Sequence, residues 1–474
     1  MNWIHRLVQL LHKFFRPSPT PDRSLPSSET LTIRDNRSLR VYEVPIRNNA
    51  VYALEFRKMT ASPGVIGQFE PGLRILDPGF QNTACAESSI THIDGTLGRI
   101  TYRNYTIEHL FEHHDFEDVM YLLIWGQLPS LAEKRHFQLS LALKCNPPQH
   151  VVETIQSFSP GATTSSMLIA GMAAYASHGE GAIHTLSSAR PVYLGRAEKV
   201  DGAIIDCIAA LACVVSLVYC HKRNKPFTPP VAEESFIANV LRMMGFSKPG
   251  REVQHCFEKL WILYADHEMT NSTAAFLHAA STLADPLSCC ISALVSGYGP
   301  LHGGAIEVAY KTFEVLKTPD NVASLIEEVR AKKQRLFGYG HRIYKTADPR
   351  TKLVRSLMDR HRDGIGAHPL LSVAMEIDRV AGSDRYFASR NLKANVDLYG
   401  CFLYTAHGFE TDIIVAMASL SRIPGVLAHR RESMLERKPL LWRPLQVFTG
   451  DAAAGVDGRS KSVDDARGTA GPAL

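Results

Sequence analysis

The chain has 474 residues, with 52 Lys and Arg against 47 Asp and Glu, a formal net charge of +5. Apolar residues make up 45% of the chain and charged residues 21%, which is typical of a folded globular protein and excludes a disordered or collagen-like chain. At roughly 100–200 residues per domain, this length predicts two or three domains with a large buried core. The net charge is small and is not gathered into a basic stripe, which disfavours a nucleic-acid-binding protein.

Residues 1–16 differ from the rest of the chain. Apolar residues recur there at helical spacing with basic residues between them, and no acidic residue precedes Asp22. Such a basic amphipathic helix is typical of a mitochondrial presequence or an interfacial anchor, although serine is absent from it. A helix that docks on its own protein or on a partner has the same pattern, so a mitochondrial or a cytoplasmic location stays open. Residues 17–30, rich in Pro and Ser, are interpreted as a linker.

The next elements are predicted from β-prone runs and then from helical periodicity. Residues 31–60 form a small β region, because short runs flank the turn pairs Asp35-Asn36 and Asn48-Asn49. After Ile107 the pattern becomes almost wholly helical, with prolines and glycines between the runs. Clear examples of predicted helices are residues 116–125, 203–219, 231–244 and 273–284. No second stretch of strands suits a parallel sheet, so we expect a mainly α fold.

The cysteines and the most apolar run both indicate core packing. The nine cysteines are odd in number and form no Cys-x-x-Cys pair, so we expect reduced thiols, with no disulfide framework or zinc site. The longest near-apolar run, residues 207–219, is shorter than the ~20 residues that cross a bilayer. We therefore expect a buried helix there and no transmembrane segment. The tail, residues 451–474, is rich in Ala, Gly, Asp and Ser and is expected to be disordered.

Four local clusters carry residue types suited to chemistry. They are 265–273 (Ala-Asp-His-Glu-Met-Thr-Asn-Ser-Thr), 299–304 (Gly-Pro-Leu-His-Gly-Gly), 337–345 (Phe-Gly-Tyr-Gly-His-Arg-Ile-Tyr-Lys) closing on 348–350 (Asp-Pro-Arg), and 395–397 (Asn-Val-Asp). The glycines beside His302 and His341 allow close backbone approach to a ligand. A histidine on such a turn can donate a hydrogen bond or transfer a proton, although one such residue alone is more often a core or turn histidine.

The sequence gives only weak support for a nucleotide-binding fold or for a metal site. Neither glycine cluster has the GxGxxG or Walker spacing of a nucleotide-binding fold. His109, His113 and His114 with Asp115 could suggest a metal site on one helix face, but a solvated polar face is the better interpretation.

Taken together, in this order and at about this spacing, the four clusters resemble the citrate synthase family. The resemblance begins upstream at Asp77-Pro78-Gly79-Phe80 and Ile93-Asp94-Gly95 and reaches Arg443-Pro444 and Thr449-Gly450, covering nearly all of residues 50–450. It implies an enzyme that condenses oxaloacetate with an acyl-CoA and then hydrolyses the thioester. No metal or bound organic cofactor is expected, because CoA enters as part of the substrate.

The resemblance also implies roles for single residues. Asp397 matches the base that takes the α-proton, His302 the donor to the thioester oxygen, and His341 the group that polarises the oxaloacetate carbonyl. The positions that bind oxaloacetate are matched by His267, Asn271, Arg350, Arg422 and Arg443, the last reaching across from a second subunit. Those near CoA are matched by Gly338, Gly340, Arg342 and Lys345.

The fold implied by the resemblance is a helical two-domain one. A large domain would combine residues 61–303 with residues 408–450, and a small domain, residues 304–407, would close over the substrates and exclude water. Because Arg443 is expected to act across the interface, the resemblance also implies an obligate homodimer.

Three positions of the acyl pocket depart from the family pattern. Ile306 stands where Asn is usual, Leu398 where an aromatic residue is common in bacterial-type members, and Ala418 where Phe is usual. Ala for Phe removes a ring's worth of volume, and a pocket there could gain about 0.8 kcal/mol for each extra methylene that it buries. We therefore expect an acyl group longer than acetyl, as in alkylcitrate synthases of specialised metabolism. Compensating bulk from Leu398 or Phe402 is the alternative.

Other functions stay open at this point. An ordinary citrate synthase would use acetyl-CoA, and a methylcitrate synthase would use propionyl-CoA. A non-catalytic homologue that senses CoA or citrate is disfavoured, because Asp397 and His302 are both present.

Overall fold

The computed structural model describes residues 29–60, 72–177, 191–246, 248–366, 368–436 and 440–449, and the structural statements that follow concern these residues. The predicted N-terminal helix, nearly all of the linker and the tail lie outside them. The chain divides into two compact units. Unit 1 takes the residues up to Ala86 together with those from Arg443 onward, and unit 2 takes Glu87–Trp442.

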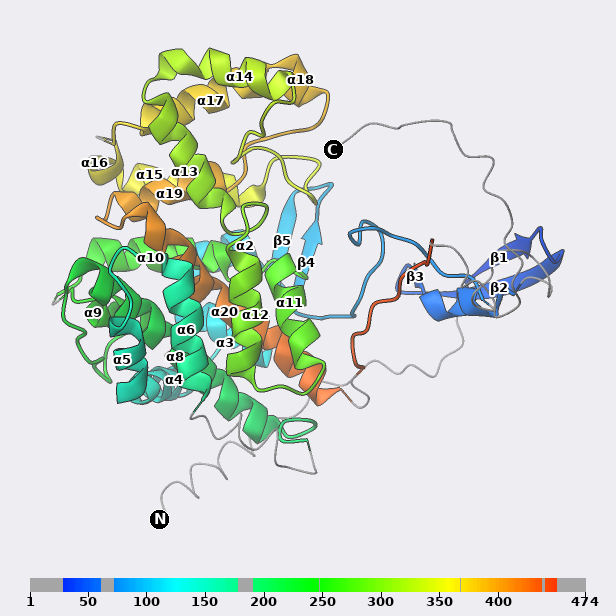
Figure 1. The fold of residues 1–474 in the computed structure, drawn as a ribbon, viewed down its shortest axis with the longest axis horizontal. Coiled ribbons are helices and arrows are strands. Elements are labelled where there is room, and N and C mark those ends of the chain that lie inside the picture. Colours follow the sequence, from blue (N-terminus) through cyan, green and yellow to red (C-terminus); the bar gives the residue numbers. More distant parts are fainter. Residues whose placement is uncertain are drawn as a thin grey trace, which may run out of the picture. The chain divides into compact units, whose positions relative to one another are not determined.

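Unit 1 contains the predicted β region. Strand β1 (Thr30–Asp35) pairs antiparallel with β2 (Arg40–Arg47), which pairs with β3 (Ala50–Val51), and the short 3-10 helix η1 (Ala53–Lys58) follows. Asn48 and Asn49 between β2 and β3 both have positive φ, 51° and 56°, which is the backbone of a tight hairpin turn that asparagine tolerates well. The Asn-Asn pair was therefore a true hairpin signal (Figure 1).

Unit 2 is mainly helical, as predicted. Its described α-helices are α2 (Ile107–His113), α3 (Phe116–Trp125), α4 (Leu131–Lys144), α5 (Gln149–Gln156), α6 (Thr164–Ala176), α8 (Ala197–Arg223), α9 (Phe236–Met243), α10 (Arg251–Tyr264), α11 (Asn271–Ala280), α12 (Pro286–Gly297), α13 (Ala305–Leu316), α14 (Val322–Arg330), α15 (Pro349–Arg360), α16 (Arg362–Ile365), α17 (Leu371–Ser383), α18 (Arg385–Ala388), α19 (Asp397–Thr405) and α20 (Ile414–Leu435), with 3-10 turns η2 (Pro319–Asn321) and η3 (Thr411–Ile413). Figure 1 shows α13–α19 grouped at one end of this unit.

Helix boundaries follow local capping. The helix predicted at residues 116–125 has those bounds, because Asp115 and Asp118 form a capping box and Gly126 ends the helix with φ of 88°. The run predicted at 273–284 is divided, because α11 ends at Ala280 and Asp285 caps the start of α12. The run predicted at 231–244 begins later, at Phe236, where Ser235 is the N-cap.

One hairpin was missed by the sequence reasoning. Strands β4 (Thr91–Asp94), β5 (Arg99–Tyr102) and β6 (Tyr105–Thr106) form a small antiparallel sheet before the first helix of unit 2. Asp94 closes the β4–β5 turn by accepting the backbone N–H groups of residues 96 and 97 at 2.9 and 2.8 Å. A Cβ on Gly95 would lie 2.4 Å from the carbonyl oxygen of Ile343, so only glycine lets the hairpin pack on that loop.

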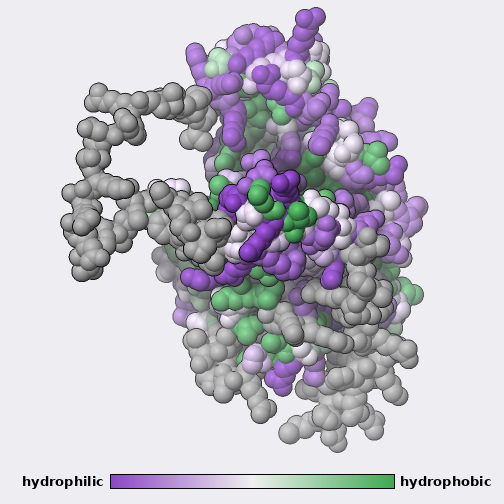
Figure 2. Space-filling model, turned by 90° about the vertical axis from the view of Figure 1, so that its right-hand side faces the viewer, coloured by the Kyte–Doolittle hydropathy of each residue, from purple (hydrophilic) through white to green (hydrophobic). Residues whose placement is uncertain are grey.

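Two long apolar helices form the centre of unit 2. Helix α8 and the segment Thr411–Leu435 are long and apolar enough to cross a membrane, yet 89% and 72% of their apolar windows are buried inside the protein. They pack against each other, and α20 also packs on α3, so they serve as core helices. Helix α8 is longer than the predicted 203–219 because it continues into polar flanks. On the face drawn in Figure 2 hydrophilic residues predominate, with apolar residues interspersed.

Core packing, which was predicted for all nine cysteines, is found for eight of them and not for Cys85. All nine are unpaired thiols, and all but the exposed Cys85 are buried. The predicted division of unit 2 into a large domain and a closing small domain at residues 304–407 stays a prediction.

Candidate active site

A cavity of about 100 Å³ lies between the helices of unit 2 and joins polar residues to an apolar wall. Its polar lining is Tyr264, Ser272, His302, Asp397, Ser419 and Arg422, and its other lining residues are Leu211, Cys290, Ala293, Leu294, Gly297, Gly303, Ile306, Val415, Ala418, Ile423 and Val426. Two helices supply most of the wall through one face each. The lining residues of α12 and of α20 are spaced three or four apart, which places each set on a single helix side.

His302 lies on the glycine turn that leads into α13. A Cβ on Gly304 would lie 2.4 Å from the carbonyl oxygen of Tyr298, so the turn is too tight for a side chain there. The backbone N–H of Ser272 donates to His302 Nε2 at 3.3 Å, and Ser272 Oγ lies 2.8 Å from the same nitrogen. A backbone N–H can only donate, so Nε2 accepts and the proton of the neutral ring is on Nδ1. Burial, and then the charge of Arg422, lowers the pKa of His302 to about 4, so the ring is neutral at pH 7.

Asp397 is the first residue of α19. Its backbone N–H donates to Asn395 Oδ1 at 2.9 Å, and the hydroxyl of Tyr264 donates to Asp397 Oδ1 at 3.4 Å. Burial raises the pKa of Asp397 to about 6, although Arg350 acts in the opposite direction. A carboxylate whose pKa lies close to neutrality is suited to take a proton and to give it back.

His341 lies on a loop that two left-handed glycines shape. Gly338 and Gly340 have φ of 82° and 84°, and the backbone N–H of Gly340 donates to the carbonyl oxygen of Lys393 at 2.7 Å. His341 Nδ1 accepts the backbone N–H of Ile343 at 3.1 Å, which leaves the proton on Nε2. Burial, with Arg350 adding, lowers the pKa of His341 to about 4.

Two arginines lie at the site, Arg350 buried and Arg422 partly buried. Arg350 Nε and Nη2 donate to the two carboxylate oxygens of Asp348 at 3.0 and 2.8 Å, a bidentate pair that holds the guanidinium in place. Arg422 Nε donates to the carbonyl oxygen of Tyr264 at 2.5 Å. The ring of Tyr264 lies 5.9 Å from the Arg350 guanidinium, so this tyrosine contacts both arginines and also Asp397. Such a positive site suits a substrate with two carboxylates.

His267 completes the polar group. Its Nε2 lies 2.9 Å from the hydroxyl of Tyr344, and its ring centroid lies 5.1 Å from that of His341. Burial, together with Arg350, keeps the pKa of His267 well below its usual value, so it is a neutral ring. The site thus holds three neutral imidazoles, two guanidiniums and one carboxylate of raised pKa.

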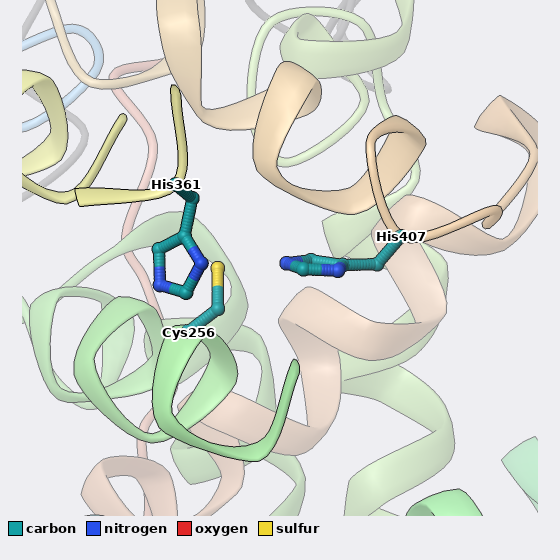
Figure 3. Close-up of side chains that lie close together, drawn as sticks. All are labelled: Cys256, His361 and His407. Atoms are coloured by element: carbon teal, nitrogen blue, oxygen red, sulfur yellow. The ribbon is translucent and has the colours of Figure 1, made fainter. Parts of the chain in front are cut away.

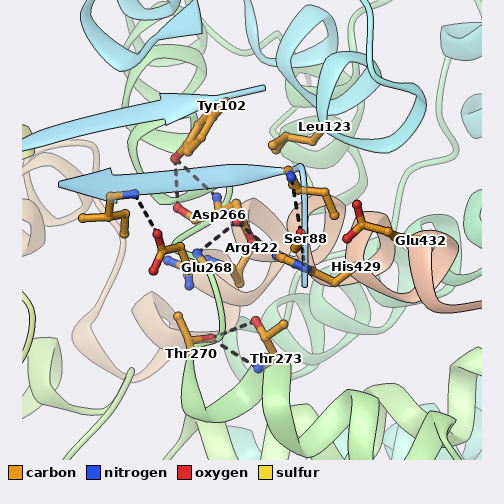
Figure 4. Close-up of polar contacts among 12 residues, drawn as sticks. Ser88, Tyr102, Leu123, Asp266, Glu268, Thr270, Thr273, Arg422, His429 and Glu432 are labelled. Carbon is orange, nitrogen blue, oxygen red and sulfur yellow. Dashed lines mark hydrogen bonds and ion pairs between the residues drawn. The ribbon is translucent and has the colours of Figure 1, made fainter. Parts of the chain in front are cut away.

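The segment that carries His267 is held by buried polar contacts, shown in Figure 4. Asp266 Oδ2 lies 3.3 Å from Nε2 of His429 on α20. Burial opposes charging of His429, but Asp266 outweighs it and raises the His429 pKa. Glu268 Oε1 accepts the backbone N–H of Ile93 at 2.7 Å, which ties the same segment to β4. Both contacts fix the backbone on either side of His267.

The remaining predicted site residues lie in different surroundings. Ile306 and Ala418 line the cavity, whereas Leu398 packs against Gly338 and is not among the lining residues. Asn271 is exposed, and its Oδ1 accepts Ser296 Oγ at 2.5 Å. Two further predicted residues, Arg342 and Lys345, are exposed on the loop that carries His341, and Arg443 is exposed in unit 1.

Sequence reasoning passed over three residues of the site. Ser272 sets the tautomer of His302, Tyr264 links the arginines to Asp397, and Tyr344 contacts His267. Ser272 and Tyr344 lay inside the quoted motifs, so their position was a usable signal. Tyr264 ends an ordinary amphipathic helix and gave none.

Known proteins resemble this chain in both sequence and fold. Residues 79–445 match the family model described as "Citrate synthase, C-terminal domain". The chain is 43% identical to the "Citrate synthase-like protein oryE" of Aspergillus oryzae, over 91% of this chain and 98% of that protein. It is 35% identical to the "Alkylcitrate synthase phiJ" of a fungal species, over 89% of this chain and 93% of that one. A solved ternary complex of citrate synthase from Thermoplasma acidophilum with carboxymethyl coenzyme A and oxaloacetate superposes with a TM-score of 0.72 at 28% identity, covering 79% of this chain and 96% of that one.

Proposed function

This chain belongs to the citrate synthase family, and we propose that it condenses oxaloacetate with an acyl-CoA longer than acetyl-CoA, giving an alkylcitrate and free CoA after thioester hydrolysis. The observation that carries the acyl length is the shape of the cavity. Its lining combines Asp397 and His302 with apolar residues of α12 and α20, Ala418 among them.

The size of the cavity sets the length of chain that fits. A cavity of about 150 Å³ lined by aliphatic residues holds a benzene, six carbons in a ring. On that scale the ~100 Å³ found here holds roughly four methylenes. We assign this volume to the part of the acyl chain beyond acetyl, which gives a hexanoyl group. Each methylene moved from water into this wall gains about 0.8 kcal/mol. The similarity to a protein named alkylcitrate synthase supports the same proposal.

The proposed condensation begins with proton removal. Asp397 accepts a proton from the α-carbon of the acyl thioester, and Nδ1–H of neutral His302 donates to the thioester oxygen as negative charge develops there. The hydrogen bond from Ser272 is what holds that N–H available, because it occupies Nε2. The neutral ring of His302 keeps this N–H near pH 7 without placing a positive charge in the buried site.

The second half of the proposal concerns oxaloacetate. Arg350, Arg422 and His267 bind its carboxylates and carbonyl region, and Nε2–H of His341 donates to the carbonyl oxygen that becomes the alcohol. The new carbon–carbon bond forms between the α-carbon of the thioester and that carbonyl carbon. Water then hydrolyses the thioester and releases CoA. We also propose a homodimer in which Arg443 of a second subunit adds to the oxaloacetate site.

The test is a panel of acyl-CoA substrates from acetyl to decanoyl at saturating oxaloacetate, with products identified by mass spectrometry. We expect kcat/KM to rise with chain length to a maximum near hexanoyl. A maximum at acetyl-CoA or propionyl-CoA would instead show an ordinary citrate or methylcitrate synthase. Absence of turnover with every thioester, together with retained CoA binding, would favour the sensing homologue.

A further inference from the structure

Three residues from distant parts of the chain meet at a second site that the proposed reaction does not use. Cys256 lies on α10, His361 follows the last residue of α15, and His407 follows α19. Their potential ligand atoms all lie within 4.8 Å of one another, and within the described residues no other group of three His, Cys, Asp or Glu does so. Figure 3 shows the Cys256 sulfur between the two imidazole rings.

Two ring nitrogens of this Cys–His cluster (Cys256, His361 and His407) make no hydrogen bond to the described residues. Nε2 of His361 and Nε2 of His407 are both buried, and neither has a hydrogen-bond partner among the described residues. A buried polar atom without a partner costs free energy, so two of them in rings that flank one thiol need an explanation. A cation bound by the thiol and by one nitrogen of each ring would explain why the three ligand atoms converge.

The chemistry of the three groups selects the cation. Burial lowers the pKa of both imidazoles, so each is neutral near pH 7 with a lone pair free to bind metal. Burial raises the pKa of the Cys256 thiol, so a cation that binds there displaces one proton to solvent. One sulfur and two imidazole nitrogens form a mixed ligand set that zinc accepts in tetrahedral geometry.

We propose that Cys256, His361 and His407 bind a zinc-type divalent cation. Around one zinc ion, sulfur at about 2.3 Å and nitrogen at about 2.0 Å place the ligand atoms roughly 3.3–3.5 Å apart, so the side chains close in by about an ångström. Glu252 stands four residues before Cys256 on the same face of α10, and its negative charge partly offsets the burial that lowers the pKa of both histidines. Its carboxylate or a water completes the fourth position.

A cation bound at the Cys–His cluster would connect three helices that also reach the candidate active site. The three helices that meet at the Cys–His cluster each have their other end at the candidate active site: α10 ends at Tyr264, α15 carries Arg350 in its first turn, and α19 begins at Asp397. At 1.5 Å rise per residue, the cluster lies roughly 12–17 Å from those residues along the helices. A bound cation therefore ties together the far ends of the three helices that position the base and one arginine.

The test uses the full-length enzyme, stripped with a chelator and titrated with Zn²⁺ alone and with Co²⁺ alone. We expect one ion per chain, a thiolate-to-cobalt absorption band, and a rise in Tm with Zn²⁺. Cys256→Ala, His361→Gln and His407→Gln should each weaken Zn²⁺ binding at least tenfold, and Cys256→Ala should abolish the thiolate band. Cys145→Ala, at another buried thiol, and His109→Gln, at an exposed histidine 4.8 Å from His113 between ring centroids, are the matched controls and should change neither.

The outcomes separate cleanly. Absence of a thiolate band, or a Zn²⁺ affinity unchanged in His361→Gln and His407→Gln, overturns the site. Loss of binding in His109→Gln alone would assign the ion to the exposed histidines and also overturn it. Should Cys256→Ala fail to fold, the partly exposed His407→Gln still decides the question. None of these readouts depends on the acyl-CoA proposed as substrate.

Discussion

Filling the cavity at residue 418 tests the proposed acyl specificity most directly. Ala418 lines the cavity on α20, and the phenyl ring of Ala418→Phe would fill much of its ~100 Å³. Four methylenes at about 0.8 kcal/mol each give a limit of about 3 kcal/mol for hexanoyl over acetyl. At 1.36 kcal/mol for each factor of ten, that limit is about 200-fold in kcat/KM.

The assay follows release of the CoA thiol at saturating oxaloacetate for acetyl-, butyryl-, hexanoyl- and decanoyl-CoA. We expect Ala418→Phe to lower the hexanoyl-to-acetyl ratio of kcat/KM by 10- to 200-fold while leaving the KM for oxaloacetate unchanged. Ala418→Val adds only two methyl groups and should give an intermediate ratio. A folded Ala418→Phe enzyme with an unchanged chain-length profile would show that the acyl chain lies elsewhere and would remove the structural reason for the proposal.

Four further outcomes are expected. Asp397→Asn should lower kcat at least 10³-fold, because the base is lost, and a turnover close to the parent's would refute the assignment. The same variant should raise the free energy of unfolding at pH 8 by up to about 3 kcal/mol, because it removes a charge that burial disfavours. Chemical denaturation measures this second effect. Since burial raises the pKa of Asp397 to about 6, kcat/KM should rise with pH through this value as the carboxyl ionises, and a flat profile from pH 5 to 7 would contradict this. Gly304→Ala should distort the turn that holds His302, because its Cβ would lie 2.4 Å from a carbonyl oxygen, and kcat should fall more than tenfold. Gly202→Ala on α8, where a Cβ would meet nothing within 4 Å, is the control and should leave kcat unchanged. Mixing inactive Arg443→Ala and Asp397→Asn enzymes after partial unfolding should restore activity, since a mixed dimer has one complete site, and failure of mixed dimers to act would place Arg443 outside the partner's site.

Short motifs with local meaning were enough to identify the chemistry from the sequence. The glycines around His302 and His341 indicated tight turns. These turns need glycine, because a Cβ on Gly303 or Gly304 would meet a backbone oxygen, and Gly338 and Gly340 have positive φ. The helix predicted from periodicity at residues 116–125 has those bounds, since Asp115 and Asp118 each accept the other's backbone N–H. Local capping and local sterics are properties of neighbouring residues, so a reading of the chain in order can find them.

The β4–β5 hairpin was missed for the opposite reason. Its strands are four residues each, too short for alternation to stand out, and they are stabilised by packing on the loop at Ile343 far along the chain. The same limit explains why Tyr264 went unnoticed: its contacts with Asp397 and Arg422 join residues more than a hundred positions apart.

By itself, then, the sequence determined the family, the mainly helical class and the residues suited to proton transfer, because each is written in residue type and short spacing. Only the tertiary structure decided which nitrogen of His302 and of His341 carries the proton, how large the cavity beside Ala418 is, and that Cys256 meets two histidines. Tautomer, cavity volume and ligand convergence depend on distances between separate helices. Those distances are set by packing of the whole core, which no local pattern encodes.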